Sequence, residues 1–169
     1  RVFDFAASSG CTTLHMASVY HAGLFLQPHN PRHKVNLLED GVAYFHPQLD
    51  LYGEIRPKRA HIARETDWFA AASARVREFG LALSAWTVCM HNSRLGENHP
   101  NAIIEDAFGN PRPYALCPSN PAVRHYVRAL VEDLTRYPLT ALLLEAFRYM
   151  GVVHGAHHER WSIPVAPLE

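Results

Sequence analysis

The side chain best placed to do chemistry is Glu145, which ends the apolar stretch LTALLLEAF between Leu139 and Phe147. An apolar run of this length that follows a helical pattern is typical of a buried parallel strand. Open α/β sheets and (β/α) barrels carry their catalytic groups at the C-terminal ends of such strands. We therefore expect Glu145 to be functional. The structural alternative is a carboxylate that ends the strand and pairs with a neighbour.

Polar and aromatic residues also follow the other strands that the sequence predicts. They are Tyr20, His21, His91, Asn92 and, just after Glu145, Arg148. Parallel strands joined by helices end at one rim of a sheet, so these side chains should gather around Glu145. Tyr20 and Trp86 could bind a ligand through their rings, although an aromatic residue in a strand is also a common core residue.

A second chemistry is suggested by the histidine-rich segment VHGAHHER after Glu145. Its candidate ligands are His154, His157, His158 and Glu159. Imidazole and carboxylate suit Zn²⁺, Fe²⁺ or Mn²⁺, and His21 and His91 could complete such a site. The spacing is not the helical HExxH arrangement, and a loop of this kind could equally hydrogen-bond a substrate. The main interpretation therefore has no cofactor, and a divalent metal such as Zn²⁺ is the alternative.

The elements that must position these residues alternate along the chain. Strands are predicted at Thr13 to Tyr20, at Leu81 to Met90 and in the run that ends at Glu145. A helix from the N-cap Asp67 to Phe79 precedes the second strand. A helix that starts at Pro121, capped by Ser119 or Asn120, precedes the third. Alternating strands and helices predict an α/β protein with parallel strands.

Two polar segments interrupt this order. Gly23 to Arg64 contains a possible short strand at Val42 to Phe45, and Ser93 to Pro118 follows the second strand. Both are longer than ordinary connections, which is typical of functional loops. Four loop carboxylates could approach the rim, but each is more typical of a solvated charge. These are Glu39, Asp40, Glu54 and Glu97.

The phrase CPSNP from Cys117 to Pro121 is followed by an amphipathic helix and an apolar strand that ends in Glu145. In this order of elements the chain resembles glycoside-hydrolase-like TIM-barrel proteins, and the resemblance covers Thr13 to Glu159. It implies a partial (β/α)8 TIM barrel, the N-terminal half, with about four parallel βα units. It also implies that Glu145 is the general acid/base of a glycoside hydrolase. The second carboxylate of such enzymes lies on a later strand, which this sequence does not supply.

The resemblance assigns the rim residues to a carbohydrate substrate. This set contains Tyr20, His21, Trp86, His91, Asn92, Arg148, His154, His157 and His158. Two alternatives remain open. One is a metal-dependent hydrolase that uses the histidine-rich loop, and the other is a non-catalytic carbohydrate-binding fragment.

Composition favours one domain, or a fragment of one, over residues 1–169. The chain is 48% hydrophobic, and its 16 basic and 16 acidic residues cancel, so we expect no nucleic-acid partner. No apolar run is long enough for a membrane helix. Three scattered cysteines, expected to be buried, favour a reducing, cytoplasmic compartment. Four βα units would leave sheet edges exposed, so a homo-oligomer is possible.

Overall fold

The computed structural model describes residues 1–151, which form a mixed α/β structure. The strands are β1 (Thr13–Tyr20), β2 (Gly23–Leu26), β3 (Val35–Leu38), β4 (Val42–Ala43), β5 (Lys58–Arg59), β6 (Ala82–Val88), β7 (Ile103–Glu105), β8 (Pro111–Leu116) and β9 (Ala141–Glu145). The α-helices are α1 (Val2–Ser8), α2 (Trp68–Val76), α3 (Ser93–Asn98) and α4 (Pro121–Thr135). Short 3₁₀ turns are η1 (Leu49–Leu51), η2 (His61–Ala63), η3 (Arg77–Phe79) and η4 (Pro100–Ala102).

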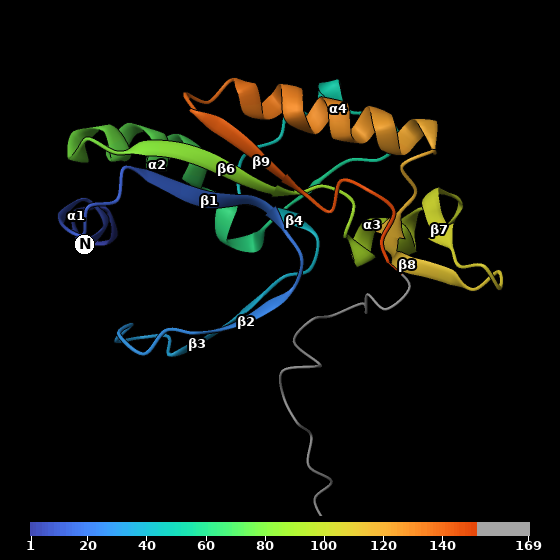
Figure 1. Cartoon of the computed structure of the whole chain (residues 1–169), viewed down its shortest axis with the longest axis horizontal. Helices are drawn as coiled ribbons and strands as arrows, with labels where there is room; N and C mark the ends of the chain where they lie inside the picture. Colours follow the sequence, from blue (N-terminus) through green and yellow to red (C-terminus); the bar gives the residue numbers. More distant parts are fainter. Residues whose placement is uncertain (152–169) are drawn as a thin grey trace, which may run out of the picture.

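The main sheet has five strands in the order β5-β4-β1-β6-β9 (Figure 1). β1 runs parallel to β6, and β6 runs parallel to β9, with Ser84 opposite Ala141. These are the three strands that the sequence predicted, so their parallel order is confirmed. Helix-containing crossovers join them, which is the usual way to connect parallel neighbours.

The other edge of the sheet differs from a run of parallel units. The segment after β1 turns back, so that β4 pairs with β1 in the antiparallel direction, with Val19 opposite Ala43. β5 is parallel to β4. The described residues therefore contain three successive parallel strands where about four βα units were expected.

Helices α2 and α4 cover one face of the sheet. In α4, Val123, Val127, Leu130 and Leu134 are buried, as their helical spacing predicted. The predicted N-caps are also confirmed. Asp67 Oδ1 accepts from Ala70 N at 3.0 Å, and Asn120 Oδ1 accepts from Ala122 N at 2.8 Å. None of the helices in residues 1–151 is long and apolar enough to span a bilayer.

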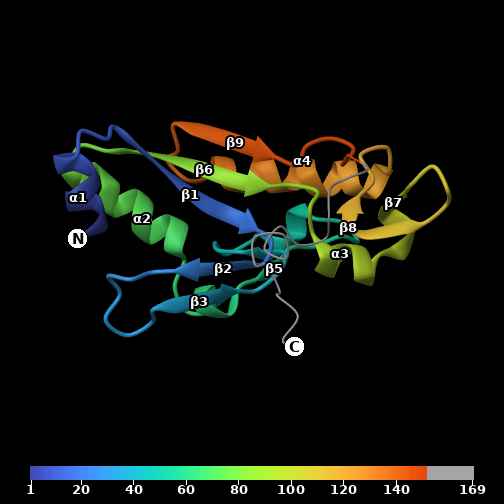
Figure 2. The same ribbon diagram turned by 60° about the horizontal axis from the view of Figure 1, so that its bottom comes forward.

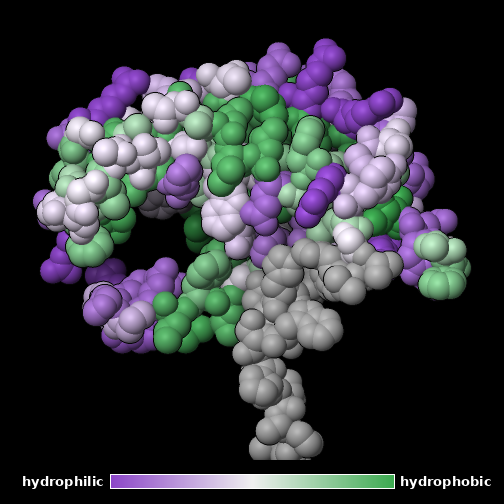
Figure 3. Space-filling view, in the orientation of Figure 1, coloured by the Kyte–Doolittle hydropathy of each residue, from purple (hydrophilic) through white to green (hydrophobic). Residues whose placement is uncertain are grey.

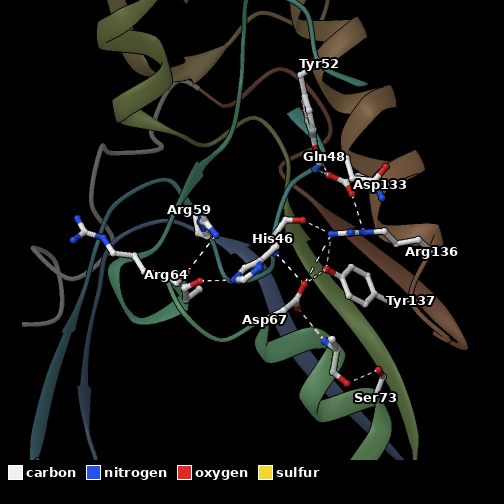
Figure 4. A network of polar contacts seen from close by, with 12 residues as sticks. His46, Gln48, Tyr52, Arg59, Arg64, Asp67, Ser73, Asp133, Arg136 and Tyr137 are labelled. Atoms are coloured by element: carbon white, nitrogen blue, oxygen red, sulfur yellow. Dashed lines mark hydrogen bonds and ion pairs between the residues drawn. The ribbon is translucent and has the colours of Figure 1, made fainter. Parts of the chain in front are cut away.

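A polar network ties the segment before α2 to the C-terminal end of α4 (Figure 4). Asp67 Oδ2 accepts from Tyr137 Oη at 2.6 Å and from the backbone N–H of His46 at 3.2 Å. Asp133 Oδ2 accepts from Tyr52 Oη at 3.0 Å, and Arg136 lies 3.0 Å from its other oxygen. These contacts hold α2 and α4 together on the face of the sheet that they cover.

Two smaller pieces lie outside the sheet. α3 and the β7–β8 hairpin lie beyond the C-terminal ends of the parallel strands (Figure 1). The β2–β3 hairpin projects from the end of β1, on the side of the sheet away from α4 (Figure 2). The piece containing β7 and β8 is the one that contributes to the rim.

Candidate functional site

The ends of the parallel strands bring a row of rings together. The Tyr20 ring meets the Trp86 ring edge-on at 5.0 Å and stacks on His21 at 4.3 Å between ring centroids. His21 stacks on His91 at 4.9 Å, and the ring of Tyr114 follows at 5.9 Å. The row therefore crosses from β1 to the segment after β6 and on to β8. Sequence reasoning placed the first four of these residues at the rim and missed Tyr114.

Glu145 lies beside this row and contacts Trp86 directly. The indole N–H of Trp86 donates a hydrogen bond to Glu145 Oε2. β6 and β9 place the two residues on one face, because Trp86 is opposite Leu143 and Val88 is opposite Glu145. The indole can only donate, so it fixes the carboxylate as an acceptor. Within residues 1–151, Oε1 accepts no hydrogen bond.

A small cavity opens in front of Glu145. Its volume is about 190 Å³, and it is lined by His91, Glu145, Ala146, Arg148, Met150 and Gly151. Arg148 is exposed and makes no ion pair with the acidic side chains of the described residues. The cavity thus has one carboxylate, one guanidinium and one imidazole on its wall.

The backbone turns sharply where Glu145 ends the strand. Ala146 has a φ of 52°, in the left-handed region that residues other than glycine seldom adopt. Such conformations cost about 1–3 kcal/mol and are found preferentially at functional sites. The turn directs residues 148–151 back across the rim to form the far wall of the cavity.

The far wall is held by residues that the sequence did not reveal as part of the site. The hydroxyls of Ser119 and Tyr149 lie 2.5 Å apart, and Arg112 Nη1 donates to the Gly151 carbonyl at 3.3 Å and to Tyr114 Oη at 3.2 Å. Only Ser119 had a signal, since it lies in the CPSNP phrase. The positions of Arg112 and Tyr114 at the site could not be predicted, because they depend on where the β7–β8 hairpin folds back.

Asn92 lies at the rim but its amide is used inside the protein. It is 1% exposed, its Oδ1 accepts from Leu95 N at 2.9 Å as the N-cap of α3, and its Nδ2 donates to the Gly41 carbonyl at 3.1 Å. Gly41 has a φ of 60°, and a Cβ there would lie 2.0 Å from Asn92 Oδ1. Only glycine tolerates both the positive φ and the close approach of the Asn92 side chain. Asn92 therefore positions α3 and the start of β4.

The histidines of the rim are buried. His21 is 4% exposed and its Nδ1 lies 2.7 Å from the Ala22 carbonyl, while His91 is 3% exposed. The remaining candidates, His154, His157 and His158, lie outside the described residues. Among residues 1–151, no three His, Cys, Asp or Glu side chains come together as a possible metal site.

Cysteine chemistry is not favoured at this rim. Burial raises the pKa of the Cys89 thiol to about 12, and the charge of Glu145 adds to that effect. Cys89 therefore remains a thiol, and it contacts the Thr87 carbonyl at 3.4 Å. The expectation that all three cysteines are buried was wrong for Cys11, which is exposed in the turn after α1, and Cys117 is half-buried.

The four loop carboxylates do not line the cavity of Glu145. Glu39 accepts from His61 N at 2.5 Å, and Asp40 Oδ1 accepts from Ala22 N at 3.1 Å. Glu54 and Glu97 are exposed. Within the described part of the chain, Glu145 is thus the one carboxylate on the cavity wall.

Comparison with known proteins adds no family to this geometry. No family model matches the chain, and no curated protein matches its sequence.

Proposed function

We propose that this chain binds a carbohydrate at the rim and acts as a glycoside hydrolase with Glu145 as the general acid/base. The observation that carries the proposal is the Trp86–Glu145 hydrogen bond beside an open cavity. Glycoside cleavage needs a carboxyl group that donates a proton to the leaving oxygen, and an aromatic ring offers an apolar face to a sugar. Glu145 supplies the carboxyl group, and Tyr20 and Trp86 supply aromatic rings beside it.

The fold that belongs to this proposal is a partial (β/α)8 barrel. Three parallel strands with helices on one face support it, as does the position of the polar side chains at the strand ends. The last strand, β9, is an edge of the described sheet, where a closed barrel would continue.

Within this mechanism each rim residue has a stated task. Glu145 Oε2 is held by the indole of Trp86, so Oε1 is the atom that exchanges a proton with the glycosidic oxygen. Arg148 lines this cavity and can donate to sugar hydroxyls, and the His91 ring forms part of the same wall. A second carboxyl group, about 5–9.5 Å from the first, must act as nucleophile or base. Residues 1–151 do not place one on this cavity wall.

The proposal is tested with a panel of aryl glycosides. Replacing Glu145 by Gln keeps the shape and the hydrogen bond from Trp86 but removes the acid. We expect Glu145→Gln to lower hydrolysis by about 10²–10⁴-fold. Glu97→Gln, at an exposed position in α3, is the matched control and should leave the rate unchanged.

The alternatives give different results in the same assay. Hydrolysis that survives Glu145→Gln but is lost with a chelator would replace this mechanism by a metal-dependent one that uses the histidine-rich loop. Saccharide binding without turnover of any aryl glycoside would support the non-catalytic carbohydrate-binding fragment.

A further inference from the structure

The β2–β3 hairpin carries an apolar face that nothing in residues 1–151 covers. We call it the hairpin face, and it consists of Leu24, Leu26, Val35 and Leu37. Leu24 pairs with Leu37 and Leu26 pairs with Val35, and cross-strand partners point to the same side. The exposed fractions are 48% for Leu24, 74% for Leu26, 56% for Val35 and 78% for Leu37.

The opposite face of the hairpin is the one that contacts the body of the protein. Phe25 lies 6.3 Å from the Tyr20 ring, and Leu38 packs on the small cluster around Val42. An opening separates the rest of the hairpin from the body (Figure 3). A two-stranded hairpin is marginally stable in water by itself. Burial of its second apolar face against a partner would stabilise it.

The tip of the hairpin is hydrogen-bonded within itself and positively charged. Asn30 Oδ1 accepts from the backbone N–H groups of Arg32 and His33, each at 3.0 Å, and Lys34 Nζ donates to the Pro28 carbonyl at 2.6 Å. Residues 27–34 contain no acidic side chain. Arg32 and Lys34 form no ion pair within the described part of the chain.

The base of the hairpin is acidic and hollow. Glu39 and Asp40 follow β3 directly. A cavity of about 350 Å³ lies there, lined by Leu37, Leu38, Glu39, Tyr44, Ala60, His61 and Ile62. Tyr44 is 8% exposed, and its hydroxyl has no hydrogen-bond partner among the described residues. Burial raises the pKa of Tyr44 to about 12, with the charge of Glu39 adding to it, so the hydroxyl stays neutral.

We propose that the hairpin face binds the same face of a second copy of this chain, with the two hairpins antiparallel about a twofold axis. A self-complementary patch is what such an axis requires. In this arrangement the basic tip of each hairpin lies over the acidic base of the other. The partner's Arg32 or the partner's Lys34 then reaches the cavity that holds Glu39 and the Tyr44 hydroxyl. The basic tip of one copy meets the acidic base of the other only in the antiparallel arrangement.

The expected interface is small, because each copy contributes only the four side chains of the hairpin face and the tip of the hairpin. Interfaces below about 1,200 Å² are those of weak or transient complexes. We therefore expect weak self-association that depends on protein concentration. The inference does not depend on the proposed function, because the hairpin face is not part of the cavity of Glu145.

Sedimentation velocity over a concentration series tests the hairpin face. Leu26→Asp should weaken self-association at least tenfold, because it places a charge in the dimer contact. Phe108→Asp, at an 88% exposed site between β7 and β8, is the matched control and should leave it unchanged. A wild-type chain that stays monomeric overturns the proposal. So does a dimer that resists Leu26→Asp and dissociates with Leu143→Asp, which would assign the contact to the β9 edge.

A charge-swap experiment tests the antiparallel arrangement. One variant carries Arg32→Glu with Lys34→Glu at the tip, and the other carries Glu39→Lys at the base. Each should self-associate more weakly than the wild type, since like charges then meet. The mixture should associate more tightly than either variant alone, because in the mixed dimer both tip and base pairs have opposite charge. A mixture no tighter than its components would contradict the arrangement, provided that circular dichroism shows both variants folded.

Discussion

At the scale of single residues, the carboxylate of Asp67 accepts hydrogen bonds from three different parts of the chain. Its Oδ1 caps α2, as the sequence predicted, while its Oδ2 accepts from Tyr137 and from the backbone of His46. The second set of contacts joins residues 21 and 70 positions apart along the chain. A capping signal is local and therefore readable from the sequence, whereas contacts of this range depend on the packed helices.

We predict that Asp67→Ala destabilises the protein by about 1–3 kcal/mol, because it removes an N-cap and leaves Tyr137 without its acceptor. The measurement is the free energy of unfolding from urea titration. Asp50→Ala, at an exposed position in η1, is the control and should change that free energy by less than about 0.5 kcal/mol. Equal stability of the Asp67 variant and the wild type would show that the network is not formed.

The same carboxylate predicts a pH dependence. Burial alone would raise the pKa of Asp67, but hydrogen bonds from Tyr137, Ala70 and His46 outweigh it and hold the pKa below its ordinary value. The unfolded chain then binds this proton more readily than the folded one. The contribution of Asp67 is complete above the unfolded pKa of about 3.9 and is lost as the pH falls through the lower folded value.

We therefore expect the difference in unfolding free energy between the wild type and Asp67→Asn to shrink on acidification below about pH 4. Urea titrations at a series of pH values measure it. A difference that stays constant from neutral pH to pH 2 would contradict the charged state assigned to Asp67.

At the scale of elements, the long periodic segments could be read from the sequence. Helices α2 and α4 and strands β1, β6 and β9 have clear spacing, caps or apolar runs, and each was found close to its predicted place. Two hairpins were missed. β2 and β3 are separated by an eight-residue connection, residues 27–34, which is longer than the usual hairpin turn. β8 contains Pro111 and Pro113, which argue against a strand.

The missed hairpin β7–β8 matters for the candidate site. The approach of the parallel strand ends, and with it the neighbourhood of Trp86 and Glu145, followed from topology alone. The far wall at residues 148–151, which Arg112 and Ser119 hold through Gly151 and Tyr149, did not, because it depends on how β8 packs against the segment after β9. The sequence pattern thus identified Trp86 and Glu145 on one side of the cavity. It did not identify the residues that close the opposite side.

The docking of α3 on β8 gives a test at this scale. A Cβ at Gly96 would lie 1.7 Å from the Pro113 carbonyl oxygen. Gly96→Ala should therefore destabilise the protein by about 1–3 kcal/mol from overpacking, although alanine favours a helix over glycine by about 1 kcal/mol. Thermal unfolding measures the change. Glu97→Ala, an exposed neighbour in the same helix, should have little effect. A stabilised Gly96 variant would show that α3 does not pack on β8 as described.

At the scale of the whole molecule, the described sheet has an uncovered edge next to an apolar groove. The groove lies between α4 and β9, has a volume of about 500 Å³, and includes Val127, Val131, Leu144 and Phe147 in its wall. In a closed barrel the next helix would pack against such a surface. The groove is therefore consistent with the partial barrel that we propose, and it lies on a different side from the hairpin face.

The central claim is that the rim around Trp86 and Glu145 binds a carbohydrate. Nuclear magnetic resonance of protein with ¹⁵N-labelled tryptophan tests it directly, because the indole N–H of Trp86 contacts the carboxylate itself. Its signal is assigned by its loss in Trp86→Phe. Trp68, whose indole N–H donates to the Ile62 carbonyl at 2.8 Å, serves as the internal control.

We predict that at least one saccharide in a panel of neutral and acidic sugars shifts the Trp86 signal in a saturable way and leaves the Trp68 signal in place. Glu145→Ala should move the Trp86 signal in the absence of sugar, since the acceptor is gone, and should weaken the saccharide response. A Trp86 signal that no saccharide shifts would contradict the account.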